Sequence, residues 1–273
     1  MKKYFFLISM FFLSISLKAQ QQLVKLWETD SVVNMPESVL HDPKAKILYV
    51  SIMGNSPDDK DGIGGIGKLG LDGKVINLEW ITGLNSPKGL AKFGNLLYAT
   101  DLTEVVVMDI AKGKVIRKIP IKNTKFLNDV TVDDKGIVYV SDSRTKEIFK
   151  IEDNVPSLYL NNLSGVNGLK AIKKDLYILA GKNLLKADEN KKITEIGLLP
   201  AGGDGLEPIG NGDFICSSWG GYVYYVTADG KTEVLLDTHL EKKNTADIGY
   251  DPVKKIVYIP TFYKKTVMAY QLK

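Results

Sequence analysis

Reactive residues are scarce in this 273-residue chain, which has one cysteine and two histidines. A single cysteine excludes an intramolecular disulfide. Cys216 lies within the apolar run Phe214–Ser217, so we expect a small buried hydrophobe rather than a reactive thiol. His41 precedes a turn at the far end of its expected strand, and His239 falls near the outer edge of its sheet. This placement argues against a Ser-His-Asp triad or a histidine base, and no G-x-S-x-G motif is present.

Long hydrophobic runs are also lacking after residue 20. The first residues combine the basic start Lys2-Lys3 with the short apolar run Tyr4–Leu17, which predicts a signal peptide over residues 1–20 and a mature chain over 21–273. The run is too short to favour a membrane span, although an uncleaved N-terminal anchor is the alternative. The composition of the leader is typical of bacteria. We therefore expect a periplasmic or secreted protein without stable membrane insertion.

A strong excess of one charge is missing as well. The formal net charge of the whole chain is +4, and it falls to +1 without the three lysines of the predicted signal peptide. Phosphate binding needs a concentrated basic surface, so nucleic acid is not an expected partner. No proline-rich linker, charge block or low-complexity tract divides residues 21–273, which predicts a single domain.

What the chain does contain is a repeated template. Each copy is an apolar run with a polar residue at its start, followed by a turn and a second run that usually contains tyrosine. The six starts are Pro36–Val39, Pro87–Leu90, Leu127–Val130, Val166–Leu169, Gly203–Leu206 and Ala246–Gly249. A repeat of about 40 residues with several short strands per unit is typical of β-propellers. We therefore predict an all-β, six-bladed β-propeller with almost no helix.

The chain ends can close such a ring. The sixth repeat ends with Thr266–Leu272, which supplies only its third strand. The run Leu23–Glu28 can supply the fourth strand from the other end of the chain. An N-terminal strand that closes the last blade leaves no open sheet edge, and a monomer is then the expected state.

The six polar residues should meet at one mouth of the central channel, because each begins the innermost strand of its blade. They are Glu37, Lys88, Asn128, Asn167, Asp204 and Asp247. The second strand of each blade ends at the same mouth. Residues at or just beyond these ends are Met53, Asp101, Asp142, Trp219 and Phe262. Side chains held by strands in this way suit a preorganised site.

Four members of the ring have the chemistry of a site for a hard divalent cation, most simply Ca²⁺. Glu37 and Asp204 offer carboxylates, and Asn128 and Asn167 offer amide oxygens. Calcium takes six to eight oxygen ligands, so this set leaves room for water and a substrate. The ring contains no histidine or cysteine, which disfavours zinc and redox metals. A polar ring that only wets a solvent channel is the alternative.

The repeats resemble the gluconolactonase/regucalcin (senescence marker protein) family of six-bladed propellers. More distantly, they are similar to the squid-type diisopropyl fluorophosphatases and the paraoxonases. The segments that carry the resemblance occur in the family's order and are Pro36-Glu37, Leu127–Val130, Tyr139–Asp142, Val166–Leu169 and Gly203–Leu206. The resemblance implies a metal-dependent hydrolase of a sugar lactone or related ester. It also implies that Glu37 is the leading metal ligand and that Asp204 is both a ligand and the candidate base.

Two ring residues depart from the family pattern. Lys88 has no counterpart, and we expect it to stabilise a developing oxyanion, to bind an anionic group of the substrate, or to pair with Glu37 and compete with the metal. Asp247 also has no counterpart, and it either binds a further ion or is solvated. In the expected mechanism the cation polarises the substrate oxygen. Asp204, with Lys88 as a second catalytic candidate, then acts on water or on the substrate.

Several alternatives for the mouth stay open. Asp101, Asp142, Asp247, Trp219 and Phe262 are expected to line the substrate pocket, but the two aromatic residues can instead serve in blade packing. The protein can also be a non-catalytic propeller that binds a small molecule or peptide there, or a plain interaction scaffold. Propellers carry many functions, so the fold does not decide among them.

Two local motifs are misleading. Gly62–Lys68 matches a dinucleotide-binding pattern and most of a P-loop, but Leu69 replaces the magnesium-binding hydroxyl and a strand-like run follows. We expect this segment to be a mobile loop over the mouth of the first blade. The acidic stretch after Pro57 resembles part of an EF-hand, yet it lacks the first ligand and has Lys68 at the twelfth position.

Overall fold

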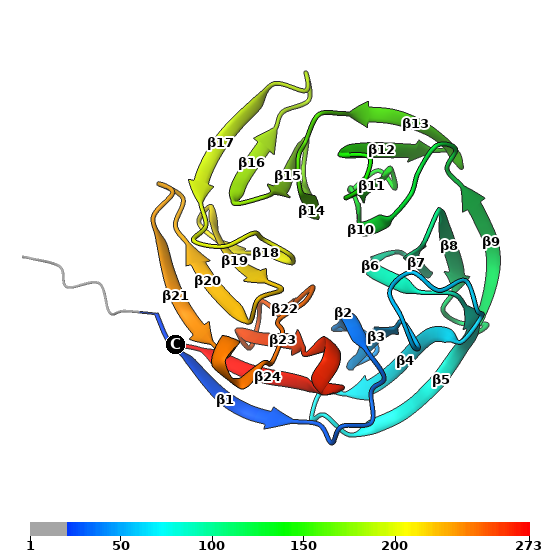
Figure 1. The fold of residues 1–273 in the computed structure, drawn as a ribbon, viewed down its shortest axis with the longest axis horizontal. Helices are drawn as coiled ribbons and strands as arrows, with labels where there is room; N and C mark the ends of the chain where they lie inside the picture. The colour runs from blue at the N-terminus through cyan, green and yellow to red at the C-terminus, as the bar shows by residue number, and fades with distance from the viewer. Residues whose placement is uncertain (1–20) are drawn as a thin grey trace, which may run out of the picture.

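The computed structural model describes residues 21–273, so the predicted signal peptide over residues 1–20 lies outside the described residues. Six four-stranded antiparallel sheets surround a central channel, which confirms the predicted six-bladed β-propeller (Figure 1). Helix in the described part is limited to the 3-10 turns η1 (His239–Glu241) and η2 (Phe262–Lys264). Over residues 21–273, no helix combines the length and the apolar character that a membrane crossing requires.

Five blades are built from four strands that follow one another in the chain, with the first strand innermost, and the sixth combines β22 to β24 with β1 (Figure 1). The first two blades contain β2 (Pro36–Asp42), β3 (Ile47–Ile52), β4 (Gly64–Gly70), β5 (Val75–Leu84), β6 (Pro87–Phe93), β7 (Leu96–Asp101), β8 (Glu104–Asp109) and β9 (Lys114–Pro120). The third and fourth contain β10 (Leu127–Val132), β11 (Val138–Asp142), β12 (Glu147–Glu152), β13 (Val155–Leu160), β14 (Val166–Ile172), β15 (Asp175–Ala180), β16 (Asn183–Ala187) and β17 (Ile193–Leu198). The last two contain β18 (Leu206–Gly210), β19 (Asp213–Ser218), β20 (Tyr222–Val226), β21 (Thr232–Asp237), β22 (Gly249–Asp251), β23 (Ile256–Pro260), β24 (Val267–Leu272) and β1 (Leu23–Glu28).

The sixth blade is closed by the N-terminal strand, as predicted. Its order is β1-β24-β23-β22, with Leu23 opposite Leu272. Beyond this pair, Gln22 and Lys273 exchange two backbone hydrogen bonds of 3.0 Å. Pairing of the two chain ends inside one sheet closes the ring of blades.

Hydrophobic layers between neighbouring blades hold the ring together. Between the second and third blades, for example, buried Tyr98 and Val107 pack with Val140 and Phe149. Alternate residues along each strand face such a layer, which is why the runs are rich in valine, isoleucine and tyrosine. Cys216 lies fully buried in one of these layers, and burial raises the pKa of its thiol. Its prediction as a core hydrophobe is confirmed.

The glycine-rich segment of the first blade is a strand and not a mobile loop, so that expectation is wrong. A Cβ atom on Gly64 would lie 2.5 Å from the carbonyl oxygen of Asn85, and one on Gly65 would lie 2.3 Å from that of Ile81. The glycines therefore allow close approach of neighbouring backbone in β4. Met53 and Pro57, in the preceding connection between β3 and β4, line a pocket at the channel mouth.

Candidate functional site

The inner strands of four blades begin with the same irregularity. Regular pairing of β2 with β3 is interrupted between Pro36 and Val39, and the corresponding interruption recurs in β6, β10 and β14. The ring residues in these bulges are Glu37, Lys88, Asn128 and Asn167. A bulge bends the strand and redirects a side chain, and here it places each ring residue at the channel mouth.

Serine hydroxyls complete the backbone hydrogen bonding beneath three of the ring residues. In each case the N–H of the next residue in the chain donates to a serine on the adjacent strand. The donors and acceptors are Ser38 and Ser51 (2.8 Å), Asp129 and Ser141 (3.0 Å), and Gly205 and Ser217 (2.8 Å). Because these N–H groups are buried, a partner is needed to offset their desolvation. The serines thus hold the ring residues in one geometry.

Five of the six predicted ring residues line one pocket of about 270 Å³ at the mouth. They are Glu37, Lys88, Asn128, Asn167 and Asp204. Apolar side chains form the rest of the wall, and the sequence predicted three of them, Met53, Trp219 and Phe262. The pocket is also lined by Pro57 and Phe126, which lie on loops, and by Tyr263, which lies in η2. The sequence does not predict these three, because all lie outside the strand repeat.

The polar floor of the mouth pocket directs oxygen atoms into it. The Asn167 Nδ2 atom donates to Asp204 Oδ1 at 2.7 Å, and Asn128 Nδ2 donates to Ser143 Oγ at 3.1 Å. Ser143 Oγ donates in turn to the Val166 carbonyl at 2.7 Å. Within residues 21–273, no donor occupies the amide oxygen of either asparagine or Oδ2 of Asp204. Amide and carboxylate oxygens of this kind are ligands for hard cations.

Glu37 is the least satisfied group of the pocket. Its side chain is buried, and its Oε2 atom has no hydrogen-bond partner in the described part of the chain. Burial, followed by the nearby Asp204 carboxylate, holds the pKa of Glu37 well above its usual range, and Lys88 opposes this only in part. Burial also raises the pKa of Asp204 to about 7, despite the hydrogen bond from Asn167. A divalent cation would supply the missing partner for both acids.

The donor set fits a hard cation better than a transition metal. Residues 21–273 contain no group of three or more histidine, cysteine, aspartate or glutamate side chains arranged to hold an ion. A cation at the mouth therefore depends on the two carboxylates together with the asparagine oxygens. Oxygen-only sets with neutral members are typical of Ca²⁺ and not of Zn²⁺.

Lys88 does not pair with Glu37. Its Nζ atom donates to the carbonyl oxygens of Pro57 at 2.9 Å and Ser86 at 3.1 Å, and it lies 4.2 Å from the centre of the Phe126 ring. Burial lowers the pKa of Lys88 to about 8, although the fields of Glu37 and Asp101 act against the shift. The carboxylate of Glu37 is thus left for another partner.

Asp101 and Asp142 do not line the pocket, so their expected place there is corrected. Asp101 accepts hydrogen bonds from the backbone N–H groups of Asn85 and Ser86. Asp142 accepts four backbone N–H bonds, from Lys125, Phe126, Arg144 and Thr145. Both carboxylates turn back from the strand end into the adjoining loop, because the loop N–H groups need acceptors. They are anchors for the connections that lead to Lys88 and Asn128.

Replacing Asp142 by alanine should lower the free energy of unfolding by about 2 kcal/mol or more, because four buried or half-buried N–H groups lose their acceptor. Urea unfolding followed by tryptophan fluorescence measures this. Asp134→Ala is the matched control, since Asp134 is exposed on a hairpin turn. Equal stability of the two variants would show that the Asp142 anchor contributes nothing.

The repeat pattern also predicts the wrong position for Asp247. The N–H of Ala246 donates to Pro260 O at 3.1 Å, just as the N–H of Asp204 donates to Ser217 O at 2.8 Å. Ala246 is therefore the structural equivalent of Asp204, and Asp247 lies one residue further along the inner strand. A shift of one residue turns a side chain to a different side of its strand. The ring at the mouth consequently has five polar members and one alanine.

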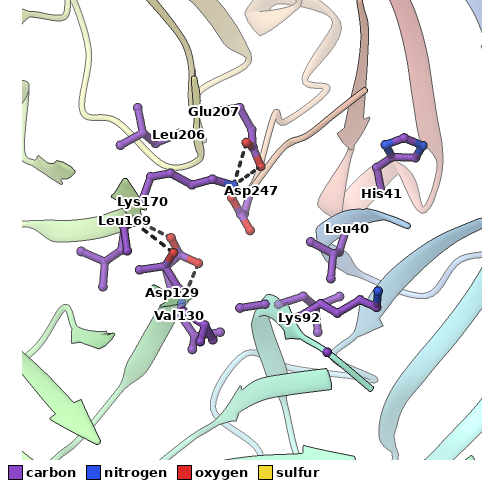
Figure 2. A pocket seen from close by; sticks show the side chains of 16 residues that line it. Leu40, His41, Lys92, Asp129, Val130, Leu169, Lys170, Leu206, Glu207 and Asp247 are labelled. Atoms are coloured by element: carbon purple, nitrogen blue, oxygen red, sulfur yellow. Dashed lines mark hydrogen bonds and ion pairs between the residues drawn. The ribbon is translucent and has the colours of Figure 1, made fainter. Parts of the chain in front are cut away.

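Asp247 lines a second pocket of about 300 Å³ at the opposite end of the inner strands (Figure 2). Asp129 also lines it and accepts N–H bonds from Val130 and Leu169, while burial raises the pKa of Asp129 to about 7. In Figure 2 the Lys170 ammonium reaches Glu207, with which it forms a 2.7 Å ion pair. One sequence signal points to Asp129, which is its position directly after Asn128.

Comparison with known proteins adds information on the fold. No family model matches the chain, and no curated protein matches it. Among solved structures, two crystal structures of virginiamycin B lyase from Staphylococcus aureus superpose with a TM-score of 0.64. One is a catalytically inactive variant with quinupristin, and the other is a selenomethionine-substituted protein. The identities are 13% and 14%, over 93% of this chain and 99% and 100% of those chains. The likeness shows the propeller fold alone. The narrower gluconolactonase/regucalcin resemblance rests on the sequence motifs.

Proposed function

We propose that the protein is an exported, monomeric hydrolase that acts with a divalent cation, Ca²⁺, on a sugar lactone or related ester at the mouth pocket. The observation that carries the proposal is the buried Oε2 atom of Glu37, which has no partner within residues 21–273. A buried acceptor without a donor costs free energy unless a ligand satisfies it. The neighbouring oxygens of Asp204, Asn128 and Asn167 complete a set that suits a cation.

The bound cation would act as a Lewis acid on the substrate carbonyl. Glu37 would hold it as an ionised carboxylate, and the amide oxygens of Asn128 and Asn167 would add neutral ligands. Asn167 also holds Asp204 through the 2.7 Å hydrogen bond to Oδ1. This bond leaves Oδ2 of Asp204 available to take a proton from the attacking water. Without a cation, burial raises the pKa of Asp204 to about 7. A bound cation would lower this pKa and so keep the carboxylate ionised and able to accept a proton at neutral pH.

An aromatic wall next to these groups favours a ring-shaped or partly apolar substrate. Trp219 packs edge-on against Phe262, with ring centres 5.6 Å apart, and against Tyr263 at 5.9 Å. Phe262 is buried, whereas Trp219 and Tyr263 keep 45% and 57% of their surface exposed. Exposed aromatic faces beside a polar floor can cover a bound ring and exclude water from the reaction.

The catalytic group proposed for this chain is not a histidine, in contrast to the solved neighbour. In virginiamycin B lyase, a histidine-to-alanine variant is catalytically inactive. The mouth pocket of this chain contains no histidine, since His41 lines the opposite pocket and His239 lies in η1. The carboxylate pair of Glu37 and Asp204 is therefore the better candidate for catalysis in this chain.

Calcium titrated into chelator-stripped protein should bind with a Kd in the micromolar range or below, and Glu37→Gln should weaken binding about 100-fold, because one anionic ligand is lost. Isothermal titration calorimetry measures both values. Glu195→Gln is the control, since Glu195 is an exposed residue of β17.

Turnover of a panel of sugar lactones should cease in stripped protein and return with Ca²⁺. A folded wild-type protein that gives no calcium heat contradicts the proposal. Calcium binding without turnover of any lactone or ester would instead identify a non-catalytic binding propeller that uses the same pocket.

A further inference from the structure

Lys88 is a buried cation whose charge no carboxylate within residues 21–273 neutralises directly. Only 2% of its surface is exposed, and it forms no ion pair. Its two hydrogen bonds go to the neutral carbonyl groups of Pro57 and Ser86. A buried charge is normally paired, because the loss of hydration is costly. An anion from a bound molecule would therefore neutralise the charge of Lys88.

The acids near Lys88 are already committed to other groups. Asp101 accepts N–H bonds from Asn85 and Ser86, and Asp58 forms a 2.6 Å ion pair with Arg144. Glu37 belongs to the proposed cation site, and it lies beyond ion-pair distance of Lys88. The positive field of Arg144 adds to that of Lys88 on the same side of the pocket, next to Phe126.

An ammonium group has three N–H bonds, and the two carbonyl groups use two of them. Lys88 lines the mouth pocket, so the third N–H is available to a bound molecule there. The pocket is thus divided into two poles. Glu37 and Asp204 form one pole that attracts a cation, and Lys88 forms the other pole, beside Phe126.

We propose that Lys88 binds a free carboxylate on the substrate, so that the mouth pocket selects lactones or esters that carry a carboxylate next to the reacting ring. Acid lactones of the aldaric type have this chemistry. This substrate class rests on the proposed function as far as hydrolysis is concerned. Binding of the carboxylate by Lys88 does not depend on it. A phosphate is disfavoured, because it is best held by several donors and a single lysine offers one free N–H.

Lys88 also ties down the connection between Met53 and Ile63, so a test must separate anion binding from loop anchoring. Ser86→Ala provides this control. The Ser86 Oγ atom donates to the Ser56 carbonyl of the same connection at 3.1 Å, so the variant loosens the loop and keeps the charge. Lys88→Met removes the charge and retains much of the side-chain volume.

The probes are tetrahydrofuran-2-carboxylate and tetrahydrofuran-2-carboxamide, which share a ring shape, differ in charge and cannot be hydrolysed. Affinities are measured by ligand-observed NMR in calcium-containing buffer. Wild-type protein and Ser86→Ala should prefer the acid at least tenfold, and Lys88→Met should lose that preference. Equal wild-type affinity for acid and amide overturns the proposal. Retention of the preference by Lys88→Met also overturns it, because the cation and not the lysine would then hold the carboxylate.

Two further readouts keep the outcomes distinct. If Lys88→Met does not fold, nuclear Overhauser contacts from the acid to Lys88 and Phe126 in wild-type protein support the proposal, and contacts confined to other residues overturn it. In turnover assays, D-saccharic acid 1,4-lactone should exceed neutral D-glucono-1,4-lactone in kcat/KM at least tenfold. Lys88-dependent binding of the acid without turnover of either lactone leaves this inference standing and removes the proposed function.

Discussion

Asp204→Asn is expected to lower kcat for lactone hydrolysis about 1000-fold at saturating calcium, because an amide cannot accept the proton of the attacking water. The substitution changes shape very little. Asparagine at this position can still accept the 2.7 Å hydrogen bond from Asn167 through its amide oxygen. The backbone bond from Asp204 N–H to Ser217 O is unaffected. The loss should therefore appear in kcat and not in folding.

A pH-stat assay with calcium raised until the rate no longer changes separates the loss of the base from weaker cation binding. Asp134→Asn is the control, since Asp134 lies on an exposed turn far from the ring. A kcat within tenfold of the wild-type value would assign the base to another residue. Asp204 would then remain only as a candidate ligand for the cation.

Cation-free protein should become less stable as the pH rises from about 5 to 8. Burial raises the pKa of both Asp129 and Asp204 from 3.8 to about 7, so between these values the folded state binds more protons than the unfolded state. The free energy of unfolding then falls with increasing pH. Roughly three pKa units correspond to about 4 kcal/mol for one acid, and we expect a total loss of at least that size.

Thermal unfolding in chelator at pH 5 and pH 8 measures the effect, which should be a higher Tm at the lower pH. Calcium should remove only the part of the difference that comes from the acids at the mouth, because Asp129 lines the opposite pocket. Below pH 4.5 the trend should reverse, because hydrogen bonds outweigh burial at other acids. The Lys25 ammonium lowers the pKa of Glu28, and the Ala45 backbone N–H, followed by Lys92, lowers the pKa of Asp42. A Tm that rises steadily from pH 5 to 8 in chelator would contradict the assignment of these buried acids.

The strand repeat made most of the ring predictable. Each of the first five repeat starts has an apolar or glycine residue, a polar residue and then a small or polar residue. In the first four of them, the inner strand has the same interruption of regular pairing. The sixth start was aligned on its acid, Asp247, although Ala246 makes the equivalent backbone bond. Residue type alone cannot show this one-residue shift of the sixth repeat, because Ala246 occupies the position that is polar in the other five.

The direction of a side chain at the end of a strand also cannot be predicted from the sequence. Asp101 and Asp142 were correctly placed at the ends of β7 and β11, but an acid there can face the pocket or accept N–H bonds from its own loop. In both cases the carboxylate faces the loop, because several backbone N–H groups of the loop donate to it. Phe126 and Tyr263 were missed for a related reason, because loop residues carry no repeat by which to align them.

The joining of β1 to β24 has a consequence for biosynthesis. Of the strands in residues 21–273, the ribosome makes β1 first, yet its neighbour in the sheet, β24, is the last of them to be made. Five blades can assemble from strands adjacent in the chain, whereas the sixth must wait until the C-terminal residues emerge. Contacts between the ends of a chain are slow to form, because a long loop must close before they are gained. The ring is therefore complete only after β24 has left the ribosome.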